Sequence, residues 1–320
     1  MKTGVIIGKF YPPHAGHKYL IETALAQVDD LTVIVCAHPR QTVSGELRAE
    51  WLREIHPGLQ VVTTPDDLPD EPLSWGRRTI EILGRAPDIV FTSEEYGHGY
   101  AAAMGCAHCL VDLDRITVPI RATAIRNDPV ANWTFLEPCV RSYCTKRIVL
   151  VGVESTGKTT LAEQLAREFH AEWVPEYGRE YCLTKTGEWH TDEFVHIAGE
   201  QQRREEIAAR QSKGILICDT NAFATGVWHE RYMGYRSSEV DAIGRKDRVD
   251  LYLLAMPDFP FVQDGTRDGE NIRDWMQERF EARMRETTTP FIRLKGSRER
   301  RLSDALSAIR GLPSSPFGPA

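Results

Sequence analysis

Short runs of β-branched residues alternate with segments of helical apolar spacing through the first half of the chain. The pattern predicts strands at residues 5–7, 31–36, 60–63 and 89–92, and helices at 17–27, 46–55 and 75–83. The alternation restarts with a strand at 147–151 and a helix at 158–169. Strands separated by helices predict parallel sheets covered on both faces, so we expect an α/β fold in each half.

The restart of the pattern also predicts the domain organisation. Residues 142–146 are poor in aliphatic side chains, and we place a boundary there, with domains at 1–144 and 145–310. The second half adds predicted strands at 215–218 and 251–255 and predicted helices at 191–212 and 270–286. Three prolines and two glycines fall in residues 311–320, which predicts a flexible tail.

The composition of the chain limits the kinds of partner that the protein is expected to bind. The 320 residues carry a formal net charge of −7, which argues against a nonspecific nucleic-acid binder. No apolar run approaches the roughly 18 residues of a membrane span. Seven scattered cysteines are typical of free thiols in a reducing cytoplasm. The pair Cys106 and Cys109 lacks a second ligand pair, so we interpret this segment as the start of a buried strand rather than a zinc or redox site.

The first predicted strand leads directly into a glycine- and histidine-containing loop. A helix that begins after such a strand offers free N–H groups to phosphate, and the glycines let a bulky ligand approach. Two histidines three positions apart face the same way on a helix and can donate hydrogen bonds to a triphosphate. The alternative is a proline-rich turn with two incidental histidines. The candidate ATP-binding residues here are Gly8, Lys9, Phe10, His14, Gly16 and His17.

A second loop, between the strand at 147–151 and the helix at 158–169, matches G-x-x-x-x-G-K-[ST] in full. Its N–H groups are expected to cradle phosphates, with Lys158 on the β,γ-phosphates and the Thr159 hydroxyl on Mg²⁺. The strand-loop-helix placement makes a chance match rare. The candidate ATP-binding residues are Gly152, Glu154, Ser155, Thr156, Gly157, Lys158, Thr159 and Thr160.

Charged residues near the second loop supply the remaining candidates for chemistry. Asp219 ends a predicted strand and is expected to hold Mg²⁺, while Glu176 is a candidate base for a substrate hydroxyl. Arg267, with Arg273 as second choice, lies in or after a glycine-flanked loop that suits a lid over ATP. The alternatives are a strand-end cap for Asp219, a surface salt bridge for Glu176 and a bland exposed loop around Arg267.

The first loop resembles the H-x-G-H nucleotidyltransferases, whose fold is a Rossmann-like doubly wound sheet and whose histidines stabilise a triphosphate during attack on the α-phosphorus. Their second motif, I-S-x-T-x-x-R, is matched by residues 120–126 except that Arg121 replaces serine. The resemblance implies that Thr123 caps a helix and contacts phosphate, and that Arg126 neutralises the leaving pyrophosphate. The cation at Arg121 is expected to slow adenylyl transfer or rearrange the phosphate clamp.

Residues 91–97, 126–133 and 147–181, together with the order of the two halves, resemble the NadR family. That resemblance implies a kinase domain that phosphorylates nicotinamide riboside to nicotinamide mononucleotide (NMN), and an adenylyltransferase domain that converts NMN to NAD. It implies that the enzyme requires ATP and Mg²⁺, and that an aromatic side chain stacks on nicotinamide. Core packing is the alternative for the tryptophans. The candidates for nicotinamide-nucleotide binding are Trp75, Trp51 and Tyr177.

Some NadR proteins carry an N-terminal helix-turn-helix domain, for which the first strand near Gly4 leaves no room, and we expect no DNA-binding role. A Nudix pattern is absent from the sequence. Two other functions stay open: a working kinase beside a first domain that only senses nucleotide, or a P-loop regulator that binds a protein partner. A homo-oligomer also stays open.

Overall fold

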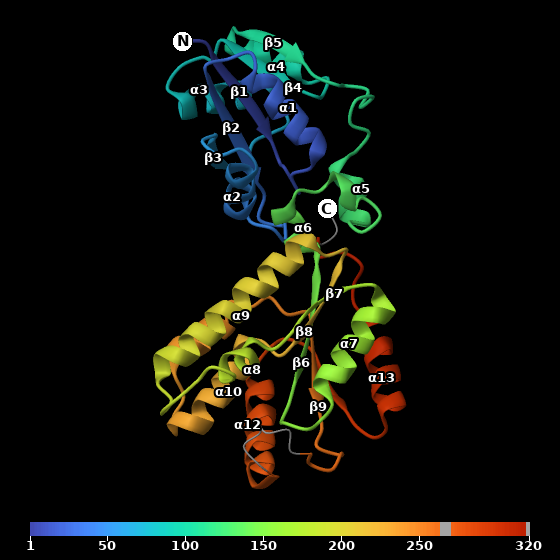
Figure 1. Ribbon diagram of the computed structural model, residues 1–320. Coiled ribbons are helices and arrows are strands. Elements are labelled where there is room, and N and C mark those ends of the chain that lie inside the picture. Colours follow the sequence, from blue (N-terminus) through green and yellow to red (C-terminus); the bar gives the residue numbers. More distant parts are fainter. Residues whose placement is uncertain (263–269, 318–320) are drawn as a thin grey trace. The chain divides into compact units, whose positions relative to one another are not determined.

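The computed structural model describes residues 1–262 and 270–317, and it divides the chain into two compact units (Figure 1). The first unit comprises Met1–Val140 and the end of the chain from Ser314, and the second comprises Arg141–Pro313. Each unit holds one five-stranded sheet in which the paired strands run parallel. The expected α/β class with two parallel sheets is confirmed.

The sheet of the first unit has the strand order β3-β2-β1-β4-β5, with the change of direction at β1. Such a doubly wound order places a ligand crevice at the carboxyl ends of the central strands. The strands of the first unit are β1 (Thr3–Gly8), β2 (Asp30–Ala37), β3 (Gln60–Pro65), β4 (Ile89–Thr92) and β5 (Ala107–Leu110). Its helices are α1 (Ala15–Leu25), α2 (Gly45–Ile55), α3 (Pro72–Leu83), α4 (Gly97–Met104), α5 (Ala122–Asn127), the 3-10 turn η1 (Trp133–Phe135) and α6 (Pro138–Cys144), which crosses the division between the units.

Successive side chains of a strand point to opposite faces of the sheet, and in the first unit each face has its own apolar core. On one face, Ile6 and Val33 pack with apolar residues of α1 and α2. On the other, Val5 and Ile34 pack with α3 and α4. Burial of both faces explains why these strands are runs of valine and isoleucine rather than alternations of apolar and polar residues.

The second unit has the strand order β10-β9-β6-β8-β7. Its strands are β6 (Lys146–Val151), β7 (Glu172–Val174), β8 (Ile215–Asp219), β9 (Leu251–Ala255) and β10 (Phe291–Leu294). Its helices are α7 (Lys158–Phe169), α8 (Tyr177–Cys182), α9 (Thr191–Gln211), α10 (Ala222–Met233), α11 (Ser238–Gly244), the 3-10 turn η2 (Glu270–Ile272), α12 (Arg273–Glu286) and α13 (Arg298–Arg310).

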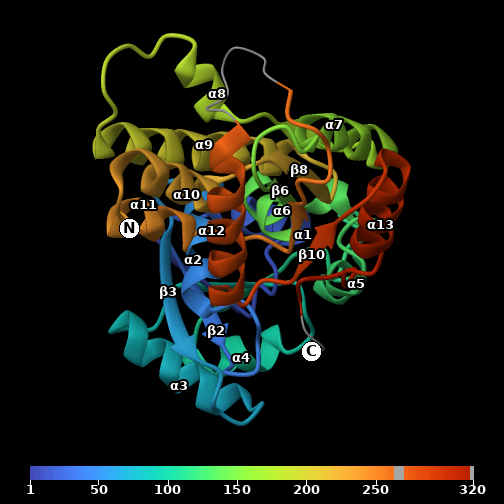
Figure 2. The same ribbon diagram turned by 90° about the horizontal axis from the view of Figure 1, so that it is seen from below.

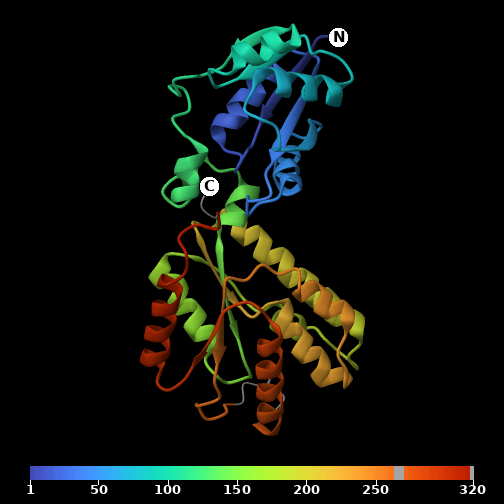
Figure 3. The same ribbon diagram turned by 180° about the vertical axis from the view of Figure 1, so that it is seen from behind.

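Helices cover both faces of the second sheet as well. Figure 2 shows α7 and α13 on one side of this sheet, and α9, α10 and α12 on the other, and Figure 3 shows the same division from behind. Ile148 and Leu150 of β6 pack under α7 and α13, while Val149 and Val151 pack under α9, α10 and α12. The central strand β6 is thereby buried on both sides, and its carboxyl end leads into the P-loop, residues 152–159, which match G-x-x-x-x-G-K-[ST].

Several predicted elements are confirmed at the residues expected for them, namely β4, α7 and β9. The strand at β5 is present, but it lies at the sheet edge and is half-exposed, so the expectation of a buried strand there is wrong. The pattern gave no prediction for β7, β10, α8, α10, α11 or α13. Across the residues that the structure describes, no helix has the length and apolar character needed to cross a membrane.

The end of the chain also differs from expectation. Instead of a flexible tail from residue 311, residues 314–317 belong to the first unit, and Phe317 is only 6% exposed. A large aromatic side chain gains free energy from leaving water, and this gain outweighs the flexibility expected of the surrounding prolines and serines.

Candidate active sites

The loop between β1 and α1 brings the two predicted histidines together. His14 is the N-cap of α1, and its Nδ1 accepts the Gly16 N–H at 3.1 Å. The rings of His14 and His17 stack with centroids 3.8 Å apart and an interplanar angle of 28°. Any side chain at Gly16 would begin 3.0 Å from the His14 ring, so glycine is needed for this close packing.

Burial keeps both imidazoles neutral. It lowers the pKa of His14 to about 4, with a further contribution from the charge of Arg115. Burial also holds the pKa of His17 well below its usual range, helped by His14 and Arg115. His17 Nδ1 is buried and has no hydrogen-bond partner among the described residues. A neutral ring with an unpaired nitrogen atom, as at His17, is suited to hydrogen bonding with a polyphosphate.

The His14 pKa predicts a pH dependence of stability. The folded protein holds this ring neutral down to about pH 4, whereas the unfolded chain takes up a proton near pH 6.5. This ring therefore leaves the free energy of unfolding unchanged above pH 6.5 and lowers it as the pH falls from 6.5 toward 4, by about 3 kcal/mol in total. Urea unfolding at pH 7 and pH 5 should therefore show a smaller pH effect for His14→Gln than for the wild type. The exposed His98→Gln variant should keep the wild-type pH effect, and an equal effect in all three proteins would contradict this assignment.

Arg126 lies against the same loop. Its Nη1 donates to the Tyr11 carbonyl at 2.7 Å, and its guanidinium carbon lies 5.2 Å from the centroid of the Tyr11 ring. Its Nη2 donates to the Thr123 hydroxyl at 3.1 Å. Thr123 does not cap α5 as expected, because the helix begins at Ala122 and Arg121 occupies the N-cap position without a side-chain cap bond. Thr123 instead holds Arg126, and Arg121 is exposed.

The remaining residues predicted at the first site have mostly structural contacts. Phe10 is buried at a φ of 47°, with its ring centroid 4.8 Å from that of His17. Lys9 forms an ion pair with Asp66 at 3.0 Å. Gly8 ends β1, where an added Cβ would lie 3.4 Å from the Phe10 ring. Phe10 thus supports the histidines, and Lys9 reaches toward the end of β3.

A cavity of about 510 Å³ lies at the carboxyl ends of β2 and β3, within the size range of ligand pockets. Neither predicted tryptophan lines it. Trp51 is 5% exposed within α2, and Trp75 packs against the core under α3 and α4. Core packing is therefore the better interpretation of both rings in this structure. The cavity is lined by Ala37, His38, Pro39, Gln41, Thr42, Ser44, Gly45, Glu46, Thr63, Thr64 and Pro65.

The P-loop of the second unit adopts the backbone that its glycines predict. Gly152 and Gly157 have φ values of 134° and 81°, and Ser155 is also left-handed at 59°. A Cβ at Gly152 would lie 2.6 Å from the Ala255 carbonyl oxygen, which excludes a side chain there. Lys158 Nζ donates to the Val153 carbonyl at 2.9 Å across the loop. Residues 154–160 all line one pocket.

Arg301 of α13, which the sequence analysis missed, holds the backbone of this loop. It is 3% exposed and donates to the carbonyls of Thr156 at 2.9 Å and Met256 at 2.8 Å. Its guanidinium carbon lies 4.2 Å from the centroid of the Phe259 ring. Its Nη2 also pairs with Asp258 at 3.2 Å, and a buried arginine bonded to several backbone carbonyls and a carboxylate holds loops rigidly. No motif marks it, since its partners come from distant segments.

Asp219 and Thr159 meet at the end of β8. The Thr159 hydroxyl donates to Asp219 Oδ2 at 2.5 Å, and Asp219 is 2% exposed. Its Oδ1 is buried and has no hydrogen-bond partner among the described residues. A buried carboxylate oxygen left unpaired beside a P-loop threonine fits a hard divalent cation, which takes only one or two protein ligands at phosphate sites.

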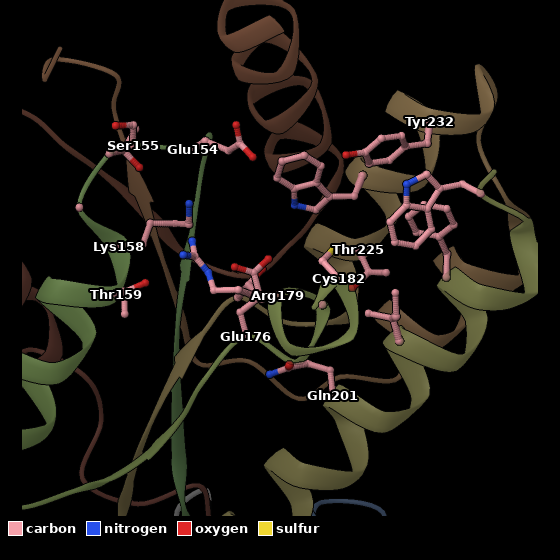
Figure 4. A pocket seen from close by; sticks show the side chains of 18 of the residues that line it. Glu154, Ser155, Lys158, Thr159, Glu176, Arg179, Cys182, Gln201, Thr225 and Tyr232 are labelled. Carbon is pink, nitrogen blue, oxygen red and sulfur yellow. The ribbon is translucent and has the colours of Figure 1, made fainter. Parts of the chain in front are cut away.

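Glu176 lies in the same pocket, close to the P-loop. Figure 4 shows its carboxylate gathered with Lys158 and Arg179 in the middle of the pocket. Burial raises the pKa of Glu176, and the charge of Lys158 partly opposes that rise. Burial likewise lowers the pKa of Lys158, opposed by Glu176 and Asp219. The expected alternative of a surface salt bridge does not describe this carboxylate.

The far wall of the pocket is aromatic, and the sequence analysis did not anticipate it. Trp189 precedes α9, and its ring centroid lies 4.8 Å from that of Phe194 and 5.1 Å from that of Tyr232. Trp228 of α10 stacks on Tyr232 at 6.3 Å. Ile197 and Gln201 of α9 complete this side. The pocket therefore runs from a phosphate cradle, past Glu176, to flat aromatic surfaces.

Two other predicted residues, Tyr177 and Arg273, are not among the described residues that line this pocket. Tyr177 is absent from its lining, because its hydroxyl bonds to His196 at 3.1 Å and its ring lies 4.4 Å from the guanidinium carbon of Arg204. Arg267 lies outside the described residues. Arg273, the second choice for the same role, is 7% exposed and donates to the Phe259 carbonyl at 3.1 Å. Its observed role is therefore structural.

These features define a chain with two α/β units, the second of which is a P-loop nucleotide-binding unit. The family described as AAA domain matches residues 147–301, in agreement with that unit. Two solved structures share the fold of the whole chain. "NadR protein in complex with NR" has a TM-score of 0.76 at 21% identity, covering 99% of this chain and 98% of the other. "NadR protein in complex with NAD and AMP-PNP" has a TM-score of 0.72 at 22% identity, covering 100% and 98%.

Sequence comparison leads to the same proteins. The chain is 27% identical to the "Trifunctional NAD biosynthesis/regulator protein NadR" of Escherichia coli, over 91% of this chain and 78% of the relative. The NadR protein of Salmonella typhimurium matches at the same identity and coverage. The chain is thus NadR-like along most of its length.

Proposed function

We propose that this chain is a bifunctional enzyme of NAD salvage. The second unit transfers the γ-phosphoryl group of ATP to nicotinamide riboside, and the first unit transfers the adenylyl group of a second ATP to the resulting NMN. The observation that carries the proposal is the pocket of the second unit, where a P-loop faces an aromatic wall across Glu176. The relatives named for NAD biosynthesis and for complexes with NR, NAD and AMP-PNP support the same substrates.

The proposed phosphoryl transfer uses the middle of this pocket. The 5′-hydroxyl oxygen of the riboside attacks the γ-phosphorus, and the bond to the bridging oxygen of ADP breaks. The proton of that hydroxyl passes to Glu176, whose raised pKa makes it a better acceptor than an exposed carboxylate. Lys158 and the P-loop N–H groups hold the phosphate oxygens in line.

A magnesium ion belongs to this proposal. Thr159 and Asp219 would hold it through the hydroxyl and the unpaired Oδ1. When bound, Mg²⁺ neutralises charge on the β- and γ-phosphates. Because the Thr159 hydroxyl already bonds to Asp219, the two ligands are pre-arranged before the nucleotide arrives.

The aromatic wall accounts for the choice of acceptor. The nicotinamide ring of the riboside is a flat pyridinium cation, and aromatic faces attract such cations by about 2 kcal/mol when they are desolvated. Trp189, Trp228 and Tyr232 present such faces on the side of the pocket opposite the P-loop. A neutral hydroxylic acceptor would gain less from this wall.

This account predicts the effect of Trp228→Leu. The KM for nicotinamide riboside should rise about tenfold, since one aromatic face is lost, while the KM for ATP should stay within about twofold. Trp228→Phe keeps a ring and should restore most of the affinity. Riboside-dependent release of ADP gives both constants. Equal KM values for the wild type and the leucine variant would remove the support that the aromatic wall gives to this substrate.

In the first unit, the proposed adenylyl transfer needs no covalent intermediate. A phosphate oxygen of NMN attacks the α-phosphorus of ATP, and pyrophosphate leaves. The neutral rings of His14 and His17 would donate hydrogen bonds to the phosphate chain, a role that their stacking and lowered pKa values support. Arg126, held on the Tyr11 carbonyl, would offset charge on the leaving pyrophosphate. The cavity at the ends of β2 and β3 offers space for the acceptor.

A further inference from the structure

The last described residue of the chain, Phe317, is buried in the first unit. It is 6% exposed, whereas Ser314, three residues before it, is exposed. The Ser315 hydroxyl accepts the Phe317 N–H at 3.2 Å and turns the backbone there. The chain thus places one aromatic ring in a defined position at the end of a segment rich in proline and serine.

The ring of Phe317 contacts the loop that carries the histidines. Its centroid lies 5.7 Å from that of the Tyr11 ring at an interplanar angle of 84°, an edge-to-face pair. Beside it, the Thr42 hydroxyl lies 3.5 Å from the Pro316 carbonyl oxygen. Thr42 also bonds to the Tyr11 hydroxyl at 2.8 Å and lines the cavity at the ends of β2 and β3. The tail therefore contacts both Tyr11 and the cavity wall.

Tyr11 in turn is the residue that contacts and holds Arg126. Arg126 bonds to its carbonyl at 2.7 Å and lies 5.2 Å from its ring centroid. The guanidinium carbon of the buried Arg48 lies 5.7 Å from the same ring. The Tyr11 ring is thus bounded by two cations and by Phe317. Without the edge of Phe317, the ring would lose an apolar restraint, and Arg126 would lose a fixed support.

We propose that Phe317 is a positioning residue of the first site: it fixes Tyr11 and thereby holds Arg126 ready for the phosphate chain of a nucleoside triphosphate. This inference rests on the proposed adenylyltransferase function of the first unit. It gives the C-terminal segment a role in the chemistry of the opposite end of the sequence. A ring that only filled an apolar hollow would not require an aromatic edge.

The test uses the full chain and measures NAD formation from NMN. Phe317→Ala should raise the KM for ATP at the first site about fivefold and lower kcat, as expected for loss of one aromatic pair and a loosened arginine. Phe317→Tyr should behave as wild type, whereas Phe317→Leu, of similar volume, should resemble the alanine variant. Ser314→Ala is the control, and riboside kinase activity in the same chain reports the amount of folded protein.

The outcomes separate this inference from the function it rests on. Unchanged constants in Phe317→Ala, or full recovery in Phe317→Leu, would overturn the positioning role. If the wild type makes no NAD, the proposed function of the first unit fails instead. In that case, calorimetric ATP binding in a Lys158→Ala background still decides the inference, because Phe317→Ala must weaken binding at the first site for it to stand.

Discussion

Replacing Lys158 by alanine should reduce phosphorylation of nicotinamide riboside by about 10³-fold or more, because the variant loses the cation that we propose contacts the transferring phosphoryl group. The ammonium lies within the P-loop, bonded to the Val153 carbonyl at 2.9 Å, with Glu176 and Asp219 as its nearby charges. Removing it leaves the loop backbone in place, since Arg301 holds the loop independently of this side chain. The loss should therefore fall on catalysis rather than on folding.

The measurement is ADP and NMN formation by the full chain, with NAD formation from added NMN followed in parallel. The second activity should stay at the wild-type level, because its residues lie in the first unit. Lys213→Ala, at an exposed position of the second unit, is the matched control. Loss of both activities in Lys158→Ala would contradict the assignment of separate sites.

The second large effect is expected for His17→Ala. Its ring stacks on His14 and has a buried, unpaired Nδ1, so alanine removes the donor proposed for the phosphate chain and the support of its neighbour. NAD formation from NMN should fall by about 10²–10³-fold, the cost of losing one donor to a developing charge. Riboside phosphorylation should be unchanged.

His98→Ala is the control for this variant, since His98 is an exposed histidine of the same unit. NAD and pyrophosphate formation give the rate, and ADP release with riboside gives the activity of the second unit. A full rate of NAD formation in His17→Ala would show that the stacked histidines are a structural pair.

Most of the fold could be predicted from local patterns in the sequence. The P-loop and α7 depend on residues adjacent in sequence, so glycine spacing and helical periodicity were enough to predict them. The stacking of His14 on His17 follows from their three-residue separation at a helix start. Short or charged elements such as β7 and α13 lacked a clear period, because tertiary packing rather than local propensity stabilises them.

The parts of the sites that escaped prediction depend on long-range contacts. Trp189 and Trp228 are 39 positions apart, and both pack against the Tyr232 ring where α9 and α10 lie together. Tyr177 follows Glu176 in sequence, yet α8 begins there and places the tyrosine ring against Arg204 rather than in the pocket. Phe317 pairs with a residue at the other end of the chain, a contact that no local pattern indicates.

The central claim is that one chain carries both steps, and a single assay tests it most directly. Purified protein is incubated with nicotinamide riboside, ATP and Mg²⁺, and NMN, NAD, ADP and pyrophosphate are followed by chromatography and a coupled readout. The account predicts NMN with one ADP per riboside consumed, followed by NAD with one pyrophosphate per NMN. NMN that accumulates without NAD would contradict the role of the first unit, and ATP hydrolysis that riboside does not change would contradict the whole account.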